Sequence, residues 1–457
     1  MSAFDLILAG GEVLTPAGLV SANVGVRNGR VAALGDLAGA EAPEILDVIG
    51  LTVMPGVIDT QVHFREPGLE HKEDLESGSR AAALGGVTAF FEMPNTKPAT
   101  TTRQALEDKL RRAAGRAWVD HAFFVGATAS NISRLGMLEM LPGCAGVKLF
   151  MGSSTGDLLV HETAAVAGVL GNGFRRVSVH SEDEERLRER RGLVEGGAPV
   201  TMHPEWRDAE AAIMNTRRLL ELAADARRRV HVLHVTTLEE MQLLADAREF
   251  ATVEVTPQHL TLSAPECYEA LGSRAQMNPP VREERHRLAL WRALEQGLVD
   301  VLGSDHAPHT LEEKKQAYPA SPSGMTGVQT LLPIMLDHVN DGLLSLERLA
   351  DLTSAGPARI FNIAGKGRIA IGYDADFAVV DRKAEWTITD KWIASKSAWT
   401  PYQGRLVKGK PIHTLVRGNV VVRDGAIEGR PLGEPVRFLE TLVSRDELPG
   451  LGLRYDL

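Results

Sequence analysis

Eight short apolar runs, separated by longer amphipathic segments, occupy the middle of this chain and constrain its fold more than any other feature. The runs lie at 57–64, 87–93, 121–126, 146–151, 176–180, 230–234, 252–256 and 299–305. The amphipathic segments Thr102–Ala114 and Asp208–Arg229 predict helices between them. Eight strands that alternate with helices predict a parallel, TIM-like (β/α)8 barrel over residues 55–365. A doubly wound sheet is the alternative, but no G-x-G-x-x-G follows the first run.

The two ends of the chain follow a different pattern. Residues 1–54 and the segment from Gly367 onward contain short alternating strands with Gly- and Asn-rich turns. Each end alone is too short for a stable sheet with its own core. We therefore expect residues 1–54 and 366–457 to form one small β-sandwich domain beside the barrel.

Composition and charge argue against several classes of partner. The net charge of −10 comes without a basic stripe, so neither a nucleic-acid partner nor a membrane partner is expected. No uncharged apolar run reaches the roughly 18 residues of a membrane span. Two cysteines, Cys144 and Cys267, are too few for a disulfide framework, and the N-terminus lacks a signal-peptide pattern. These features predict a cytoplasmic protein.

Polar side chains stand where the apolar runs end. A lone histidine at such a position is usually structural, but active sites of barrels lie at the carboxyl ends of the strands. Convergent histidines and a carboxylate with nothing to bind would cost several kcal/mol in desolvation, which a divalent metal ion offsets. Imidazole and carboxylate together favour Zn²⁺. The residues concerned are His63, Asn95, Lys148, His180, His234 and Asp305.

Lys148 is the least expected of these residues, because it lies inside an apolar run. A buried lysine can serve as an ion-pair partner or extend its charge to the surface. Alternatively, desolvation makes the amine neutral and nucleophilic. Such an amine reacts with CO2 to give a carbamate, a carboxylate that can bridge two metal ions. The neighbouring histidines favour the carbamate.

Several segments together resemble one family of enzymes. MPGVIDTQVHFREPG, EMPNT, VKLFMGSSTG, VHSED, VLHVTT, MNPP and GSDHAPH are similar to the dihydroorotases of the amidohydrolase superfamily. The similarity extends over residues 4–430, and HFREPG, EMPNT and DHAPH are its most specific parts. The resemblance implies zinc-dependent, reversible conversion of L-dihydroorotate to N-carbamoyl-L-aspartate in pyrimidine biosynthesis.

The resemblance also implies roles for individual residues. His63, carbamylated Lys148 and Asp305 would bind one metal ion, and Lys148, His180 and His234 would bind the other. Asp305 would accept a proton from the attacking water and pass it to the leaving amide nitrogen.

The same resemblance implies a binding site for the small-molecule substrate. Arg65, Asn95 and His309 would hold its α-carboxylate, and Asn278 would contact the ring amide. The small residues Gly152–Gly156 would close over the ligand. Arg65 has a second interpretation, as an ion-pair partner of Glu66 or Glu92.

Gln61 departs from the family pattern. Dihydroorotases usually carry H-x-H at the end of the first strand, and here Gln61 replaces the first histidine. An amide oxygen is a weaker zinc ligand than imidazole. We therefore expect one tightly bound zinc and a weaker second site.

Two alternatives remain open. One is another cyclic amidohydrolase, such as a hydantoinase, dihydropyrimidinase or allantoinase. The other is a non-catalytic scaffold for aspartate transcarbamoylase, which Gln61 favours and the remaining ligands disfavour. The resemblance also leaves open a homodimer.

Overall fold

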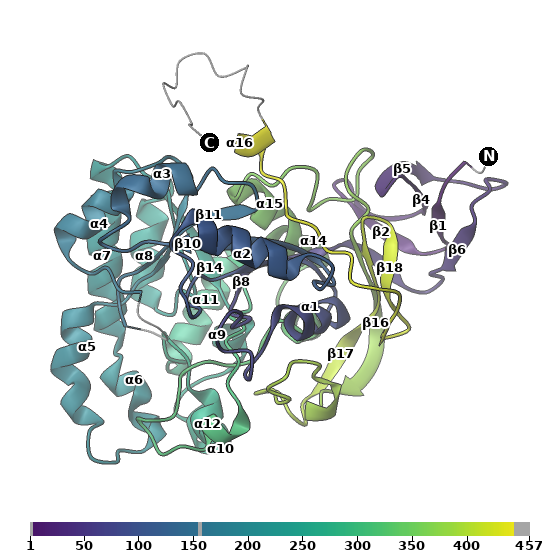
Figure 1. Cartoon of the computed structure of the whole chain (residues 1–457). Helices are drawn as coiled ribbons and strands as arrows, with labels where there is room; N and C mark the ends of the chain where they lie inside the picture. The colour runs from purple at the N-terminus through teal and green to yellow at the C-terminus, as the bar shows by residue number, and fades with distance from the viewer. Residues whose placement is uncertain (1–2, 154–157, 443–457) are drawn as a thin grey trace.

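The computed structural model describes residues 3–153 and 158–442. Its centre is an eight-stranded parallel sheet in which the strands follow one another in sequence order (Figure 1). These strands are β8 Val57–Val62, β9 Val87–Glu92, β10 Asp120–Gly126, β11 Cys144–Phe150, β12 Val177–His180, β13 Val230–Val232, β14 Ala251–Val255 and β15 Val301–Leu302. The eight apolar runs thus form the predicted strands.

The sheet curls into a barrel that closes between its first and last strands. Val62 forms a parallel bridge with His306, and the His63 amide donates to the His306 carbonyl at 2.7 Å. Every residue of β8, β9, β10 and β11 is buried, because one face of each strand fills the barrel and helices cover the other. The TIM-like barrel predicted from the sequence is confirmed.

Most of the helices in the described residues follow the barrel strands and surround them (Figure 1). The helices are α1 Leu75–Leu84, α2 Arg103–Ala113, α3 Leu135–Leu138, α4 Thr163–Leu170, α5 Glu184–Arg190, α6 His203–Trp206, α7 Ala209–Asp225, α8 Leu238–Asp246, α9 Pro257–Thr261, α10 Glu266–Leu271, α11 Glu284–Glu295, α12 Leu311–Lys314, α13 Leu331–Asn340, α14 Leu346–Ala350, α15 Gly356–Ile360 and α16 Leu439–Leu442. None of the helices in the described residues has the length and apolar character needed to cross a membrane.

The two predicted helices occur, with one difference in length. Thr102 and Asp208 cap α2 and α7, each side chain accepting a backbone N–H of the first turn. However, α7 ends at Asp225, four residues earlier than the amphipathic pattern indicates. Arg227 adopts a left-handed conformation with φ of 49°, which stops the helix.

The two ends of the chain form two further sheets, which lie to one side of the barrel (Figure 1). The four-stranded sheet has the order β5-β4-β1-β6, and the seven-stranded sheet has the order β19-β18-β17-β16-β7-β2-β3. The strands are β1 Leu6–Ala9, β2 Glu12–Thr15, β3 Gly18–Ser21, β4 Asn23–Arg27, β5 Arg30–Gly35, β6 Glu44–Asp47, β7 Thr52–Pro55, β16 Phe377–Thr387, β17 Leu406–Val416, β18 Asn419–Arg423 and β19 Ala426–Ile427.

A shared core shows why neither end forms a domain alone. Strand β7 pairs antiparallel with β16, which joins the N-terminal strands to the C-terminal ones. Leu8 and Val26 of the smaller sheet belong to the same buried cluster as Val53 and Phe377 of the larger one. The two sheets therefore form the expected β-sandwich.

One loop of the sandwich domain reaches the barrel rim. This segment, residues 388–405 between β16 and β17, contains the fully buried Trp399. The Trp399 indole N–H donates to the His309 carbonyl at 2.8 Å, and Thr326 donates to the Trp399 carbonyl at 2.7 Å. The accessory domain thus supports the rim on which candidate site residues lie.

Candidate active site

A small cavity opens at the carboxyl ends of the barrel strands. Eight of the nine site residues predicted from the sequence line it, and His309 is the exception. The lining consists of Gln61, His63, Arg65, Asn95, Lys148, Phe150, His180, His234, Asn278, Asp305, Ala307, Ser323 and Gly324. Residues from seven different strands or their following loops are therefore gathered at one place, as in barrel enzymes generally.

Three of the lining residues have left-handed backbones. Arg65, His234 and Asp305 have φ values of 67°, 40° and 43°. Each follows the end of a barrel strand, and such a conformation costs a non-glycine residue about 1–3 kcal/mol. Strain of this kind persists only where surrounding contacts maintain it, and it is concentrated at functional sites.

His63 and Asp305 face each other across the cavity. The His63 Nδ1 lies 2.7 Å from Asn95 Oδ1, and its Nε2 lies 3.3 Å from Asp305 Oδ1. Burial lowers the pKa of His63, so the ring is neutral and its single proton, on Nδ1, is donated to Asn95. The Nε2 lone pair then faces a carboxylate, an arrangement of two acceptors that suits an intervening cation.

Gln61 occupies the same side of the cavity. Its Nε2 donates to Asp305 Oδ1 at 3.1 Å. Its Oε1 is buried and has no hydrogen-bond partner among the described residues. A buried acceptor left in this way is costly, and a cation or a bound water would satisfy it.

His180 and His234 form the second facing pair. The His180 Nε2 lies 2.8 Å from Glu182 Oε2, and its Nδ1 lies 3.1 Å from His234 Nε2. Burial lowers the pKa of both rings, and a neutral His180 that donates to Glu182 presents its Nδ1 lone pair toward His234. A ligand histidine that donates its other nitrogen to a carboxylate is the usual arrangement at metal sites.

Glu182 supports His180 and was not predicted from the sequence. Burial alone would raise the pKa of its carboxyl, but Arg207 and His180 hold it at about 2. Arg207 contacts both carboxylate oxygens of Glu182. The available signal was the position of Glu182 two residues after His180 in VHSED.

Lys148 lies in β11 and is buried. Burial lowers the pKa of its amine to about 7, so a large fraction is neutral at neutral pH. Its Nζ lies 4.6 Å from the centre of the Phe150 ring. In the described part of the chain Lys148 has no ion-pair partner, which argues against the ion-pair interpretation.

In the described residues, the cavity side chains of the types that bind metal ions lie in pairs and not in larger groups. Within residues 3–153 and 158–442, no three His, Cys, Asp or Glu side chains converge on a point where a cation could be held. Lys148 lines the cavity that contains both facing pairs.

Arg65 presents donors to the cavity. Its Nε donates to the Pro308 carbonyl at 3.1 Å, and its Nη1 is buried with no partner among the described residues. Burial lowers the pKa of the guanidinium to about 10, which reflects a cation without a close counterion. The alternative pairing of Arg65 with Glu66 or Glu92 does not occur, because Glu66 pairs with Arg116 and Glu92 with Lys109.

His309 lies behind Arg65 and not in the cavity wall. Its Nδ1 is 3.1 Å from Lys72 Nζ, and its Nε2 is 3.0 Å from the Ser323 carbonyl and 3.2 Å from Arg65 Nη2. Burial lowers the pKa of His309 to about 3, so the ring is neutral. The Nδ1 of His309 also lies 3.7 Å from Glu313 Oε2. Arg65 Nη2 thus contacts His309, whereas Arg65 Nη1 has no partner in the described part of the chain and remains available to a ligand.

Two further expectations concern the cavity mouth. Asn278 lines the cavity, with Oδ1 3.1 Å from His203 Nε2. Of the predicted closing segment Gly152–Gly156, residues from Ser154 onward lie outside the described residues.

Comparison with known proteins identifies the family of this chain. The model of the amidohydrolase family matches residues 52–421, and the chain belongs to that family. It is therefore a hydrolase.

Within the family, the chain is similar to proteins that act on cyclic amides. It is 35% identical to a dihydroorotase of Methanosarcina acetivorans, over 93% of each chain. It is 34% identical to a dihydroorotase of Pyrococcus furiosus, over 93% of this chain and 95% of the relative. Among solved structures, the L-hydantoinase of Arthrobacter aurescens superposes with a TM-score of 0.90 at 30% identity, over 95% of this chain and 99% of that one.

Proposed function

We propose that this enzyme is a dihydroorotase, which interconverts L-dihydroorotate and N-carbamoyl-L-aspartate. Ring opening adds water to the ring amide carbonyl, breaks the C–N bond and transfers a proton to the leaving nitrogen. The observation that carries the proposal is the buried guanidinium of Arg65, which lines the same cavity as the histidine pairs and whose Nη1 has no partner among the described residues. A planar donor fork beside the reacting centre fits a carboxylated ring. The similarity to dihydroorotases over nearly the whole chain supports the assignment.

The residues present fit a zinc ion. His180 and His234 supply two neutral imidazoles, and a carbamate on Lys148 would complete a three-ligand set. His63 and Asp305, with the second carbamate oxygen, would hold another ion less tightly, because Gln61 offers an amide where imidazole is usual. Zinc bound here would supply an acidified water as the nucleophile.

Lys148 is suited to carbamate formation. The neutral amine attacks CO2, a new N–C bond forms, and one proton is released to solvent. The lowered pKa of Lys148 keeps the attacking amine available at neutral pH. The product carries a negative charge in a cavity whose histidines are neutral and can share a cation with it.

Asp305 is the proposed proton carrier. Its carboxylate lies beside both His63 and Gln61, at the edge of the cavity. During ring opening it accepts the proton of the attacking water and delivers it to the leaving amide nitrogen. Ring closure uses the same steps in reverse.

Other residues of the cavity would hold the substrate. Arg65 donates to the α-carboxylate through both terminal nitrogens, and Asn95 lies beside it. His309 acts from behind Arg65, and Asn278 contacts the ring amide. We propose that the enzyme acts in pyrimidine biosynthesis and in the cytoplasm. A homodimer and an association with aspartate transcarbamoylase stay predictions from the family resemblance.

Two observations favour other candidates. The superposition with L-hydantoinase favours an uncarboxylated cyclic amide, although such a substrate would leave the Arg65 fork unpaired. Gln61 favours a non-catalytic scaffold, although a scaffold has no use for the complete set of His180, His234, Lys148 and Asp305. Ring opening assayed with L-dihydroorotate, hydantoin, dihydrouracil and allantoin tests the assignment. A preference for any substrate other than dihydroorotate would refute it.

A further inference from the structure

We propose that Glu66 is a positioning residue for the substrate carboxylate, because its ion pair with Arg116 holds the turn that directs Arg65 into the cavity. The inference rests on the proposed function, since the carboxylate is that of dihydroorotate. Glu66 does not line the cavity and would act only through Arg65.

The turn at Arg65 is a strained one. The Glu66 amide donates to the Phe64 carbonyl at 2.8 Å, and Arg65 between them has a φ of 67°. A hydrogen bond across three residues with positive φ at the centre defines the rare, strained form of the γ-turn. The local sequence alone would not keep the backbone in this strained conformation, so contacts with neighbouring residues must maintain it.

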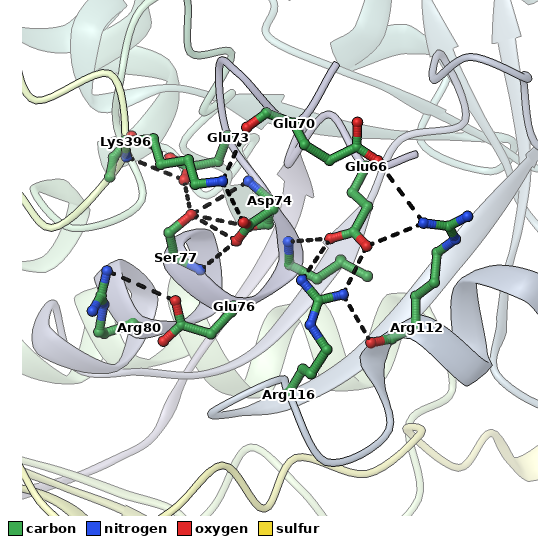
Figure 2. Close-up of polar contacts among 12 residues, drawn as sticks. Glu66, Glu70, Glu73, Asp74, Glu76, Ser77, Arg80, Arg112, Arg116 and Lys396 are labelled. Carbon is green, nitrogen blue, oxygen red and sulfur yellow. Dashed lines mark hydrogen bonds and ion pairs between the residues drawn. The ribbon is translucent and has the colours of Figure 1, made fainter. Parts of the chain in front are cut away.

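Glu66 supplies the strongest of those contacts (Figure 2). Its carboxylate is buried and accepts from both terminal nitrogens of Arg116, at 2.7 and 3.1 Å. The amide of Leu75, the first residue of α1, donates to it at 3.0 Å, and Arg112 of α2 lies 3.4 Å away. One side chain thus fastens the turn to the start of α1 and to the end of α2. Bidentate pairs of this kind restrict direction as well as distance.

The two neighbouring side chains leave the turn in different directions. The Arg65 side chain forms part of the cavity wall, whereas the Glu66 side chain contacts α1 and α2 outside the barrel strands. A displacement of the backbone at Glu66 therefore changes where the Arg65 fork lies. A misplacement of about 1 Å is enough to weaken a bidentate contact with a ligand.

The same turn is joined to the loop that carries Asn95. The Lys97 amide donates to the Pro67 carbonyl at 2.9 Å. Gly68, with a φ of 93°, approaches so closely that an added Cβ would lie 2.0 Å from the Lys97 carbonyl oxygen. The loops bearing Arg65 and Asn95 are thus packed directly against each other, and Glu66 joins them to Arg112 of α2 and to Arg116 beyond its end.

The test separates positioning from a general contribution to folding. Glu66→Gln removes the charge of the pair, and Arg116→Lys retains the charge but removes the fork. Arg111→Met is the control, since Arg111 lies in the last turn of α2, close in sequence to Arg116, but is exposed and contacts Asp108 instead. We expect both Glu66→Gln and Arg116→Lys to raise the KM for dihydroorotate about tenfold with kcat changed less than about twofold. Arg111→Met should leave both unchanged.

A structural role alone would give a different result. If the pair only stabilises the fold, part of the protein is inactive, so the apparent kcat falls with KM unchanged and the melting temperature falls in parallel. That outcome overturns the proposal.

Orotate binding, measured by calorimetry on the same variants, needs no turnover. If the wild type binds orotate but does not open dihydroorotate, the proposed function fails, while a tenfold weaker Kd in Glu66→Gln still supports the positioning role. An unchanged orotate Kd in both variants refutes it.

Discussion

Replacing Arg65 with lysine should be far from conservative. The guanidinium offers a planar fork of donors whose Nη1 has no partner among the described residues, whereas a lysine ammonium in the same place offers a single point charge. The change retains the charge and loses one of two charge-assisted hydrogen bonds, each worth about 1.5–3 kcal/mol. At about 1.4 kcal/mol per factor of ten, selection for the carboxylated ring should fall roughly 10- to 150-fold.

The assay compares two rings that differ in the carboxylate. We would measure kcat/KM for L-dihydroorotate and for dihydrouracil, with Arg111→Lys as a control for an exposed arginine. The ratio of the two values should fall in Arg65→Lys by the factor given above, with most of the change in KM for dihydroorotate. An unchanged ratio would show that Arg65 does not bind the carboxylate.

Four further predictions concern the metal side of the cavity. Asp305→Asn should lower kcat at least about a hundredfold with little change in KM, because a general acid–base is lost; near-normal turnover would remove Asp305 from the mechanism. Lys148→Ala should lose zinc and activity together, short-chain carboxylic acids should partly restore both, and full zinc content in the variant would contradict the carbamate. Only the neutral Lys148 amine reacts with CO2, and its pKa is about 7. The rate of zinc loading at fixed dissolved CO2 should therefore fall about tenfold per pH unit below 7 and level off above it; a rate independent of pH between 5 and 7 would refute this. Gln61→His should raise the occupancy of the weaker site, and equal zinc content in both proteins would count against the weakening role of Gln61.

Strand-end residues were the part of the site that the sequence could predict. A parallel barrel brings the carboxyl ends of all its strands to one face, so His63, His180, His234 and Asp305 had to meet once the eight strands were recognised. The same geometry explains why Lys148, deep in an apolar strand, lies in the cavity. Periodicity overestimated the length of α7, because a left-handed residue ends a helix without a change in the apolar pattern.

Supporting contacts between distant segments could not be predicted in this way. Glu182 and Arg207 meet across 25 residues, and Trp399 reaches His309 across 90. These contacts depend on where loops pass after the fold has formed, and no periodicity or motif in one sequence encodes them. The placement of His309 behind Arg65, and not in the cavity wall, has the same origin.

The most direct test of the proposed function combines zinc analysis with a ring-opening assay on the purified wild-type chain. The protein would be dialysed against a mild chelator, its zinc content measured, and its turnover of L-dihydroorotate followed before and after zinc is fully removed. We predict about one zinc retained per chain, ring opening that survives dialysis, and loss of activity when that zinc is removed. Retention of no zinc, together with no ring opening at any stage, would contradict the proposal and favour the scaffold instead.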